Sequence, residues 1–312
     1  MRTRAGHDAL DAGITGRHGE QGEQIGLGGR LVGAVTRATP STPTATSAIR
    51  RANAPHRPQI NRSVDADQWA GRSTDRSARR RLGPMPAIEI EHLQKRYGHV
   101  TAVDDVSLTV EHGEILGIVG VNGAGKTTTV ECIAGLTTPD AGTIRVLGLD
   151  PLADRNAIKE RVGVQLQESA LPDRLTVTEA LTLYGTFYDN PVEPAELIEQ
   201  LGLTHRRDAR YGKLSGGEKQ RVSVGLALVG RPEVAILDEL TTGLDPHARR
   251  ELWSLIASLD ITVVLVSHFM DEVERLCDRV AVMHAGRVIA LDTPASLKGA
   301  ASLEDRFVDL TR

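Results

Sequence analysis

The sequence has few aromatic residues, few cysteines and no long apolar run. Phe, Tyr and Trp make up only 3% of the 312 residues, so the core must be built mainly from Leu, Val, Ile and Ala. Two cysteines, Cys132 and Cys277, are too few for a disulfide framework, which favours a reducing compartment. No apolar stretch reaches the ~18 residues of a membrane-spanning helix. These absences exclude a disulfide scaffold and an integral membrane protein.

Lysine is absent from residues 1–86, which contain 14 Arg against 7 Asp and Glu and carry a net charge of +7. This segment shows no sustained periodicity and is rich in Gly, Ser, Thr and Pro, so we expect it to be disordered. Two alternatives stay open. The segment could be a basic arm that binds anionic lipid or RNA, or translation could begin at Met85 and leave it out.

Residues 87–312 are acidic, with 23 basic and 34 acidic side chains, which argues against a duplex nucleic-acid partner. Short apolar segments alternate here with helical ones, and no internal repeat is visible. This order predicts an α/β fold with a parallel sheet. The expected strands are 87–91, 106–110, 115–120, 143–146, 161–164, 234–237, 261–266, 279–283 and 287–291. The expected helices are 126–135, 176–188, 191–201, 215–228, 246–259 and 271–277.

A glycine-rich loop lies between the apolar strand 115–120 and the helix that begins near Lys126. Such a loop lets successive backbone N–H groups surround phosphates, aided by the positive end of the helix. The pattern is a complete P-loop, in which Lys126 contacts the β- and γ-phosphates and the Thr127 hydroxyl binds Mg²⁺. The expected nucleotide contacts are Gly120, Asn122, Gly123, Ala124, Gly125, Lys126, Thr127 and Thr128.

Two carboxylates follow the apolar strand 234–237. A triphosphate site needs a carboxylate for its metal, so Asp238 is expected to hold Mg²⁺. Glu239 is then placed to polarise the attacking water. In isolation an acidic pair after a strand is usually the start of a solvated loop, but beside a P-loop it predicts an ATP-hydrolysing site.

The segment Leu-Ser-Gly-Gly-Glu-Lys-Gln at 214–220 places two glycines at the start of a helix. Combined with the P-loop and the acidic pair, it resembles the signature Leu-Ser-Gly-Gly-Gln of the ATP-binding subunits of ABC transporters. The resemblance covers roughly 87–312. It implies an ABC-type ATPase core with an antiparallel β subdomain and an inserted helical subdomain at about 168–230. It also implies that signature residues of one subunit face the ATP of a second; these are Ser215, Gly216, Gly217 and Glu218.

The resemblance assigns roles to further residues. Tyr97 matches the aromatic residue that stacks on adenine, and Asp245 lies in the loop that crosses the dimer interface. Gln167 matches a glutamine that touches Mg²⁺ and water, with Gln165 as the alternative, and His268 matches the histidine that contacts the γ-phosphate. The expected catalytic residues are therefore Lys126, Gln167, Glu239 and His268, and the expected metal ligands are Thr127, Gln167 and Asp238.

The family usually has proline after the catalytic Glu, whereas this chain has Leu240, which we expect to loosen the turn. Leu240 and the tail at 303–307 resemble the branch that exports drugs and antibiotics. Since the chain has no membrane span, the resemblance implies a head-to-tail dimer that drives a separate permease from the cytoplasmic face of the membrane. The exported molecule would be a drug, an antibiotic or a lipid.

An apolar and aromatic stripe at helical spacing follows Thr176 and comprises Leu181, Tyr184, Phe187 and Tyr188. It indicates either the core of the helical subdomain, which we favour, or a groove for a helix of the permease. Two other functions were weighed. A soluble ABC protein of translation or DNA repair usually has two cassettes or a coiled coil, and this chain has one P-loop and no heptad run. A non-catalytic regulator would lack Lys126, Glu239 or His268, and all three are present.

Overall fold

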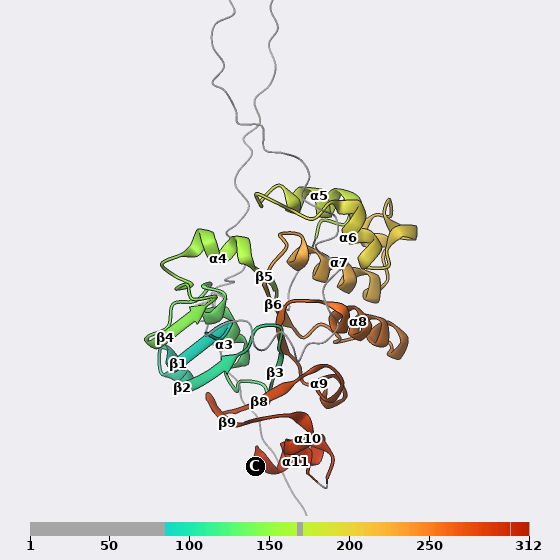
Figure 1. The fold of residues 1–312 in the computed structure, drawn as a ribbon. Helices are drawn as coiled ribbons and strands as arrows, with labels where there is room; N and C mark the ends of the chain where they lie inside the picture. The colour runs from blue at the N-terminus through green and yellow to red at the C-terminus, as the bar shows by residue number, and fades with distance from the viewer. Residues whose placement is uncertain (1–84, 167–170, 300, 312) are drawn as a thin grey trace, which may run out of the picture. The chain divides into compact units, whose positions relative to one another are not determined.

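The computed structural model describes residues 85–166, 171–299 and 301–311 (Figure 1). The predicted extension at 1–86 lies almost wholly outside the described residues. From Ala87 onward the described chain forms two sheets. The smaller is antiparallel throughout, in the order β2-β1-β4, with β1 at Ile88–Tyr97, β2 at Val100–Val110 and β4 at Ala141–Val146.

The larger sheet has six strands in the order β5-β6-β7-β3-β8-β9. All neighbouring pairs are parallel except the β8–β9 hairpin. The prediction of an α/β fold with a parallel sheet is therefore confirmed. The strand bounds are β3 Ile115–Gly120, β5 Val162–Gln165, β6 Val234–Asp238, β7 Thr262–Val266, β8 Arg279–His284 and β9 Arg287–Asp292.

Both faces of the central sheet are covered, which explains why its strands read as unbroken apolar runs. Every residue of β3, β6 and β7 is buried. Alternate side chains enter two different cores: Ile236 and Val264 pack with the three-stranded sheet, and Leu237 and Leu265 pack with the helical side. The helices on these two sides include α3 at Lys126–Ile133, and α8 at Pro246–Ser258 with α9 at Met270–Leu276.

Between β5 and β6 the described residues are helical, with α5 at Val177–Gly185, α6 at Pro194–Gln200 and α7 at Gly216–Leu228 (Figure 1, yellow to orange). The Thr176 capping box predicted for α5 is present. The helix predicted from 191 begins three residues later, because proline suits the first helical position and Pro194 occupies it.

The aromatic stripe divides between the two interpretations. Leu181 is fully buried in the core, with Tyr184 and Tyr188 packed partly against it. Phe187 is 53% exposed, and its ring lies edge-on to Tyr184 at 5.9 Å. Leu183, on α5 before the turn that carries Phe187, is also exposed. Most of the stripe therefore packs as core, and Leu183 and Phe187 remain on the surface.

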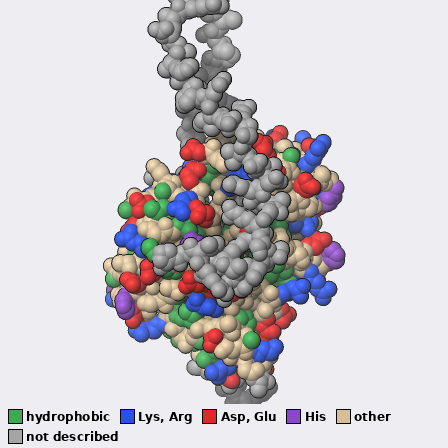
Figure 2. Space-filling view, viewed as in Figure 1, with side chains coloured by type: hydrophobic (Ala, Val, Ile, Leu, Met, Phe, Trp, Pro, Cys, Tyr) green, Lys and Arg blue, Asp and Glu red, His purple; other side chains and the backbone are tan. Residues whose placement is uncertain are grey.

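Three of the described helices were not predicted: α4 at Arg155–Arg161, α10 at Pro294–Lys298 and α11 at Leu303–Leu310. The sequences of α4 and α10 are too short or too polar for a clear period, and α4 buries only Ile158. Among the described residues, no helix is both long and apolar enough to span a membrane. On the face shown in Figure 2, basic and acidic side chains are interspersed.

Candidate functional site

Three of the predicted motifs meet at one edge of the central sheet. Strands β6, β7 and β3 are neighbours and run parallel, so their carboxyl ends lie together. Val266 pairs with both Asp238 and Ile118, which brings the acidic pair and the P-loop to either side of it. The Glu239 N–H donates to the Val266 carbonyl at 2.9 Å, which links the loop after β6 to the end of β7. Ligands of open α/β sheets bind at this edge.

The P-loop residues Val121–Gly125 join β3 to α3 in a conformation that requires glycine at Gly125. Gly125 has φ +96°, and a Cβ there would lie 2.2 Å from the Ala102 carbonyl oxygen of β2. No side chain caps α3, so its first N–H groups are left for a ligand. Lys126 is buried and its Nζ donates to the carbonyls of Gly120 at 2.9 Å and Val121 at 3.2 Å, folded back along the loop.

Charge in this edge is concentrated and poorly solvated. Burial lowers the pKa of Lys126, while the carboxylates of Glu239 and Asp238 act in the opposite direction. Asp238 is 1% exposed, and burial together with the nearby Glu239 raises its pKa to about 6, against the opposing effects of Lys126 and Thr127. A carboxylate with such a pKa is one that lacks a partner suited to its charge.

The Asp238 carboxylate fits a cation site. Neither of its oxygens makes a hydrogen bond of standard geometry to a described residue, although the Thr127 hydroxyl lies beside it. A buried carboxylate and a hydroxyl next to a phosphate-binding loop are the oxygen donors that Mg²⁺ prefers. The residues present therefore suit a magnesium ion bound together with a nucleotide.

A pocket of about 280 Å³ opens beside the P-loop. Glu239 and His268 face each other across it, with His268 Nδ1 3.7 Å from Glu239 Oε1. Glu239 has φ +50°, a left-handed conformation that turns its side chain away from the strand direction. The residues that line this pocket are Gly120, Val121, Asn122, Glu239, His268, Met270 and Phe307.

Sequence reasoning missed two residues of the pocket, Met270 and Phe307. The tail was used only as a mark of the branch, yet α11 brings Phe307 beside the P-loop. The signal was present, because Leu303, Phe307 and Leu310 follow a helical period and pack on the core.

Leu240 behaves differently from the expectation of a looser turn. Its side chain is fully buried in the core, so packing holds the turn where a proline ring would otherwise fix φ. Tyr97 lies at the end of β1, 48% exposed, with Lys95 Nζ 5.3 Å from its ring centre. The ring is exposed on the hairpin whose β2 strand touches the P-loop, and its stacking on adenine stays a prediction.

The signature forms the start of α7 and does not line this pocket. Ser215 and Glu218 form a capping box: the Ser215 N–H donates to Glu218 Oε2 at 2.8 Å, and the Glu218 N–H donates to Ser215 Oγ at 3.2 Å. Glu218 also pairs with Arg206 Nε at 2.9 Å. Asp245 caps α8 by accepting from the N–H groups of His247 and Ala248, and it too is outside the pocket.

Gln167 lies outside the described residues, so its predicted role stays a prediction. The alternative, Gln165, is described and buried. Its side-chain oxygen accepts from the Asp238 N–H at 3.2 Å, and its Nε2 donates to the Leu166 carbonyl at 2.7 Å. Gln165 is thus committed to holding β5 against Asp238, a role that its sequence position did not reveal.

Comparison with known proteins agrees with this geometry. The sequence profile of the ABC transporter family matches residues 103–242. The "Nod factor export ATP-binding protein I" of Burkholderia lata is 42% identical over 69% of this chain and 73% of its own length. The protein of that name from Ralstonia nicotianae is 40% identical over 69% of this chain and 70% of its own length.

Solved structures also resemble this chain, and they too are parts of ABC transporters. An ATP-binding subunit of an ABC transporter superposes with a TM-score of 0.65 and 28% identity, over 72% of this chain and 100% of that one. The protein cbiO1 of Clostridium perfringens, part of an ABC transporter complex, gives a TM-score of 0.62 and 28% identity over 68% of this chain and 90% of that one. The fold, the site and these relatives together place the chain in the ABC transporter family, as an ATP-binding subunit whose ATPase activity is coupled to transport.

Proposed function

We propose that this chain powers an exporter whose permease is a separate membrane protein, and that the exported molecule is a drug, an antibiotic or a lipid. The names of the relatives, which concern Nod factor export, support the direction of transport. Leu240 and the tail helix α11 support the same branch. In this proposal the subunit acts as a peripheral protein on the cytoplasmic face of the membrane.

The observation that carries the ATPase mechanism is the meeting of the P-loop, the acidic pair and His268 at one sheet edge. Lys126 would exchange its bonds to the Gly120 and Val121 carbonyls for the β- and γ-phosphates of ATP. Glu239, across the pocket from His268, would orient and deprotonate the attacking water.

The remaining residues would position the nucleotide. His268 would hold the γ-phosphate, and Tyr97 would stack on adenine. Mg²⁺, held by Thr127 and Asp238, would neutralise charge on the phosphates. The buried carboxylate of Asp238 supports this assignment because a divalent cation would satisfy its two oxygens. Gln167 completes the proposed ligand set.

We propose further that a second copy of the chain completes the site. The α7 N-terminus carries glycines and a positive helix end, which suit an anion, yet it does not line the pocket of its own subunit. A head-to-tail dimer would let Ser215–Glu218 of one subunit face the ATP bound by the other. Asp245, at the start of α8, would lie between them.

The exposed part of the aromatic stripe is the proposed contact with the permease. Leu183 on α5 and Phe187 just beyond its end are 46% and 53% exposed, while Leu181 of α5 is buried. Alanine at Phe187 should therefore leave the fold intact and uncouple ATP hydrolysis from transport. A loss of folding would instead place Phe187 in the core.

The dimer is tested with the Glu239→Gln variant. Without a base for water the bound ATP persists, so gel filtration of the full chain with Mg-ATP should show a dimer, and without ATP a monomer. Lys126→Ala in the same background is the matched control and should stay monomeric. A Glu239→Gln protein that stays monomeric with ATP would contradict the proposed dimer.

Two assays separate the rival functions. A non-catalytic regulator would bind ATP without releasing phosphate, whereas the proposed enzyme releases it and loses this activity in Glu239→Gln. A soluble factor would purify alone, whereas the proposed subunit purifies with a membrane protein.

A further inference from the structure

Glu272 is a fully buried carboxylate that none of the proposed catalytic roles uses. It lies on α9, four residues after His268, and is 0% exposed. Burial raises its pKa, with hydrogen bonds from Ser267, Trp253 and Thr241 and the charge of Arg249 acting in the opposite direction. A charge is buried so completely only where several donors compensate it.

The donors that bond to Glu272 come from two separate segments. Ser267 Oγ donates to Glu272 Oε2 at 2.5 Å from the loop after β7. Trp253 Nε1 donates to Oε1 at 2.9 Å from α8. The Thr241 hydroxyl, two residues after Glu239, lies beside the same carboxylate but makes no hydrogen bond of standard geometry to a described residue. Glu272 therefore joins the loop of His268 to helix α8.

The bond to Ser267 fixes the backbone around His268. Ser267 Oγ accepts from the Phe269 N–H at 3.0 Å while it donates to Glu272. Residues on both sides of His268 are thus held by one hydroxyl whose direction is set by the carboxylate. The His268 side chain is exposed and lies 3.7 Å from Glu239, so its position depends on this backbone.

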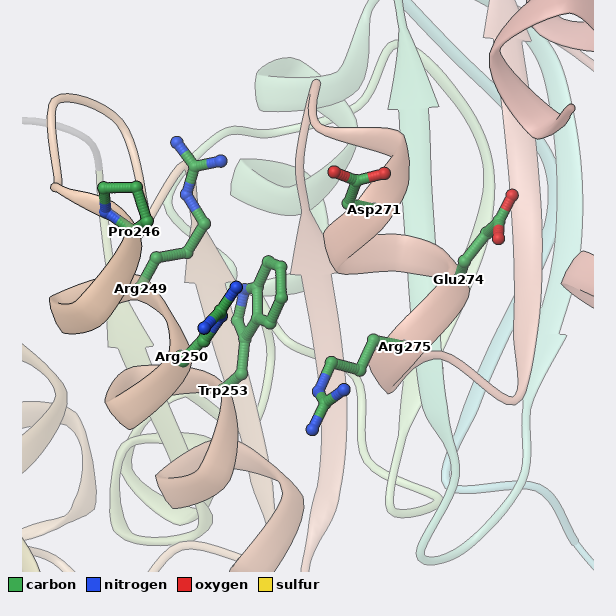
Figure 3. A pocket seen from close by; sticks show the side chains of 7 residues that line it. All are labelled: Pro246, Arg249, Arg250, Trp253, Asp271, Glu274 and Arg275. Atoms are coloured by element: carbon green, nitrogen blue, oxygen red, sulfur yellow. The ribbon is translucent and has the colours of Figure 1, made fainter.

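Above Glu272 the outer surfaces of α8 and α9 are separated by a groove of about 630 Å³. Figure 3 shows Arg249 and Trp253 on the α8 side of this groove and Asp271 on the α9 side. Arg249 lies over the Phe269 ring at 4.3 Å, next to His268. The hydrogen bond from Trp253 to Glu272 crosses between the two helices beneath this groove.

We propose that Glu272 is a positioning residue for ATP hydrolysis, whose carboxylate ties the loop of His268 to helix α8. His268 is thereby held in one arrangement beside Glu239. The proposal rests on the roles given above to Glu239 and His268. Glu272 does not line the pocket, and acts through Ser267.

A carboxylate suits this place because it accepts from both Ser267 and Trp253. Glutamine has nearly the same shape, and its oxygen can keep the bond from Trp253, which only donates, so its NH₂ group would face Ser267. In Glu272→Gln the Ser267 hydroxyl must reverse to accept, and the charge-assisted bond that fixes its direction is lost, while the side chain still fills its space. The P-loop is untouched, so ATP should bind as before.

Glu114 provides a matched control. It is also 0% exposed, accepts from the Glu111 N–H at 2.7 Å and pairs with Arg279 at 3.5 Å. It precedes β3, at the end of the strand opposite to the P-loop. Glu114→Gln therefore perturbs a buried carboxylate without reaching either catalytic loop.

The experiment measures Mg-ATP hydrolysis and thermal unfolding of the full chain. We expect Glu272→Gln to lower kcat about tenfold or more with KM within about twofold. We expect Glu114→Gln to lower the Tm while kcat per folded molecule is retained. Equal kcat values for the two variants would overturn the proposal and leave Glu272 a structural residue.

Ser267→Ala keeps the test open if Glu272→Gln does not fold, because it removes the two hydrogen bonds of the hydroxyl and no charge. It should lower kcat in the same way. The kcat of the double variant should be no lower than that of the less active single variant. Additive losses would overturn the link between the two residues. Full hydrolysis by Glu239→Gln would overturn the assignment of Glu239 instead, whatever the Glu272 variants show.

Discussion

Replacing Asp238 with asparagine should stabilise the nucleotide-free protein, although the residue lies at the centre of the proposed site. The variant keeps the shape of the side chain and removes its charge. In the folded chain burial and Glu239 raise the pKa of Asp238 from 3.8 to about 6. The folded state therefore binds this proton more tightly than the unfolded chain does.

The sign of the effect follows from linkage. Between pH 4 and pH 6 the native state binds more protons than the unfolded state, so stability falls as pH rises through this window. Above pH 6 the penalty is complete. A pKa raised by about two corresponds to a loss of about 3 kcal/mol in the free energy of unfolding, which water and ions in the open pocket reduce to about 1–2 kcal/mol.

Thermal unfolding in the absence of nucleotide and divalent cations measures this loss of stability. Asp238→Asn should raise the Tm by about 3–6 °C at pH 8, and the gain should shrink toward pH 4. Asp140 is the control, since the N–H of Arg96 lowers its pKa and Asp140→Asn should change stability in the opposite direction at pH 8. A Tm for Asp238→Asn below that of the wild type at pH 8 would refute the reasoning.

Two further changes test the loops around the nucleotide. Gly125→Ala should abolish ATP binding and lower the Tm, because its Cβ would meet the Ala102 carbonyl at 2.2 Å in a backbone with φ +96°; binding of a fluorescent ATP analogue at the wild-type affinity would contradict this. Glu218→Gln should keep the cap of α7, lose the ion pair with Arg206 at a cost of about 0.5–1 kcal/mol, and strengthen ATP-dependent dimerisation in gel filtration, since a negative charge near the proposed phosphate is removed. A weaker dimer would contradict the placement of Glu218, and Glu179→Gln, in the second capping box, is the matched control.

Local patterns were sufficient for much of the fold. The apolar run Ile115–Gly120 followed by glycines and Lys126 predicted strand, loop and helix, and each is present. The buried strands of the central sheet were recognised because both of their faces are covered, which removes any polar alternation. Helices α4 and α10 were missed, because short polar helices gain their stability from neighbours and leave a weak period in the sequence. Helix α11 was missed although Leu303, Phe307 and Leu310 recur at helical spacing.

The residues of the site likewise fall into two groups, those recognisable from local sequence and those that depend on tertiary contacts. Lys126, Asp238 and Glu239 could be predicted because the chemistry of phosphate binding requires a fixed order of residue types over a few positions. The contacts of Phe307, Gln165 and Glu272 could not, because they depend on segments 73 residues or more apart, as for Gln165 with Asp238, or on burial that one sequence does not display. A lone Glu in a sequence gives no sign that donors from two other segments will bond to it.

The sequence by itself determined the family and the class of reaction, since a P-loop, an acidic pair and a signature together are typical of an ABC-type ATPase. The tertiary structure decided the electrostatics and the geometry. Only the packing of β6, β7 and β3 side by side brings Glu239 within 3.7 Å of His268, and only burial raises the pKa of Asp238. The reason is physical: residue types fix which protons and charges are available, whereas distance and solvent exposure, which set their energies, arise when distant segments of the chain pack together.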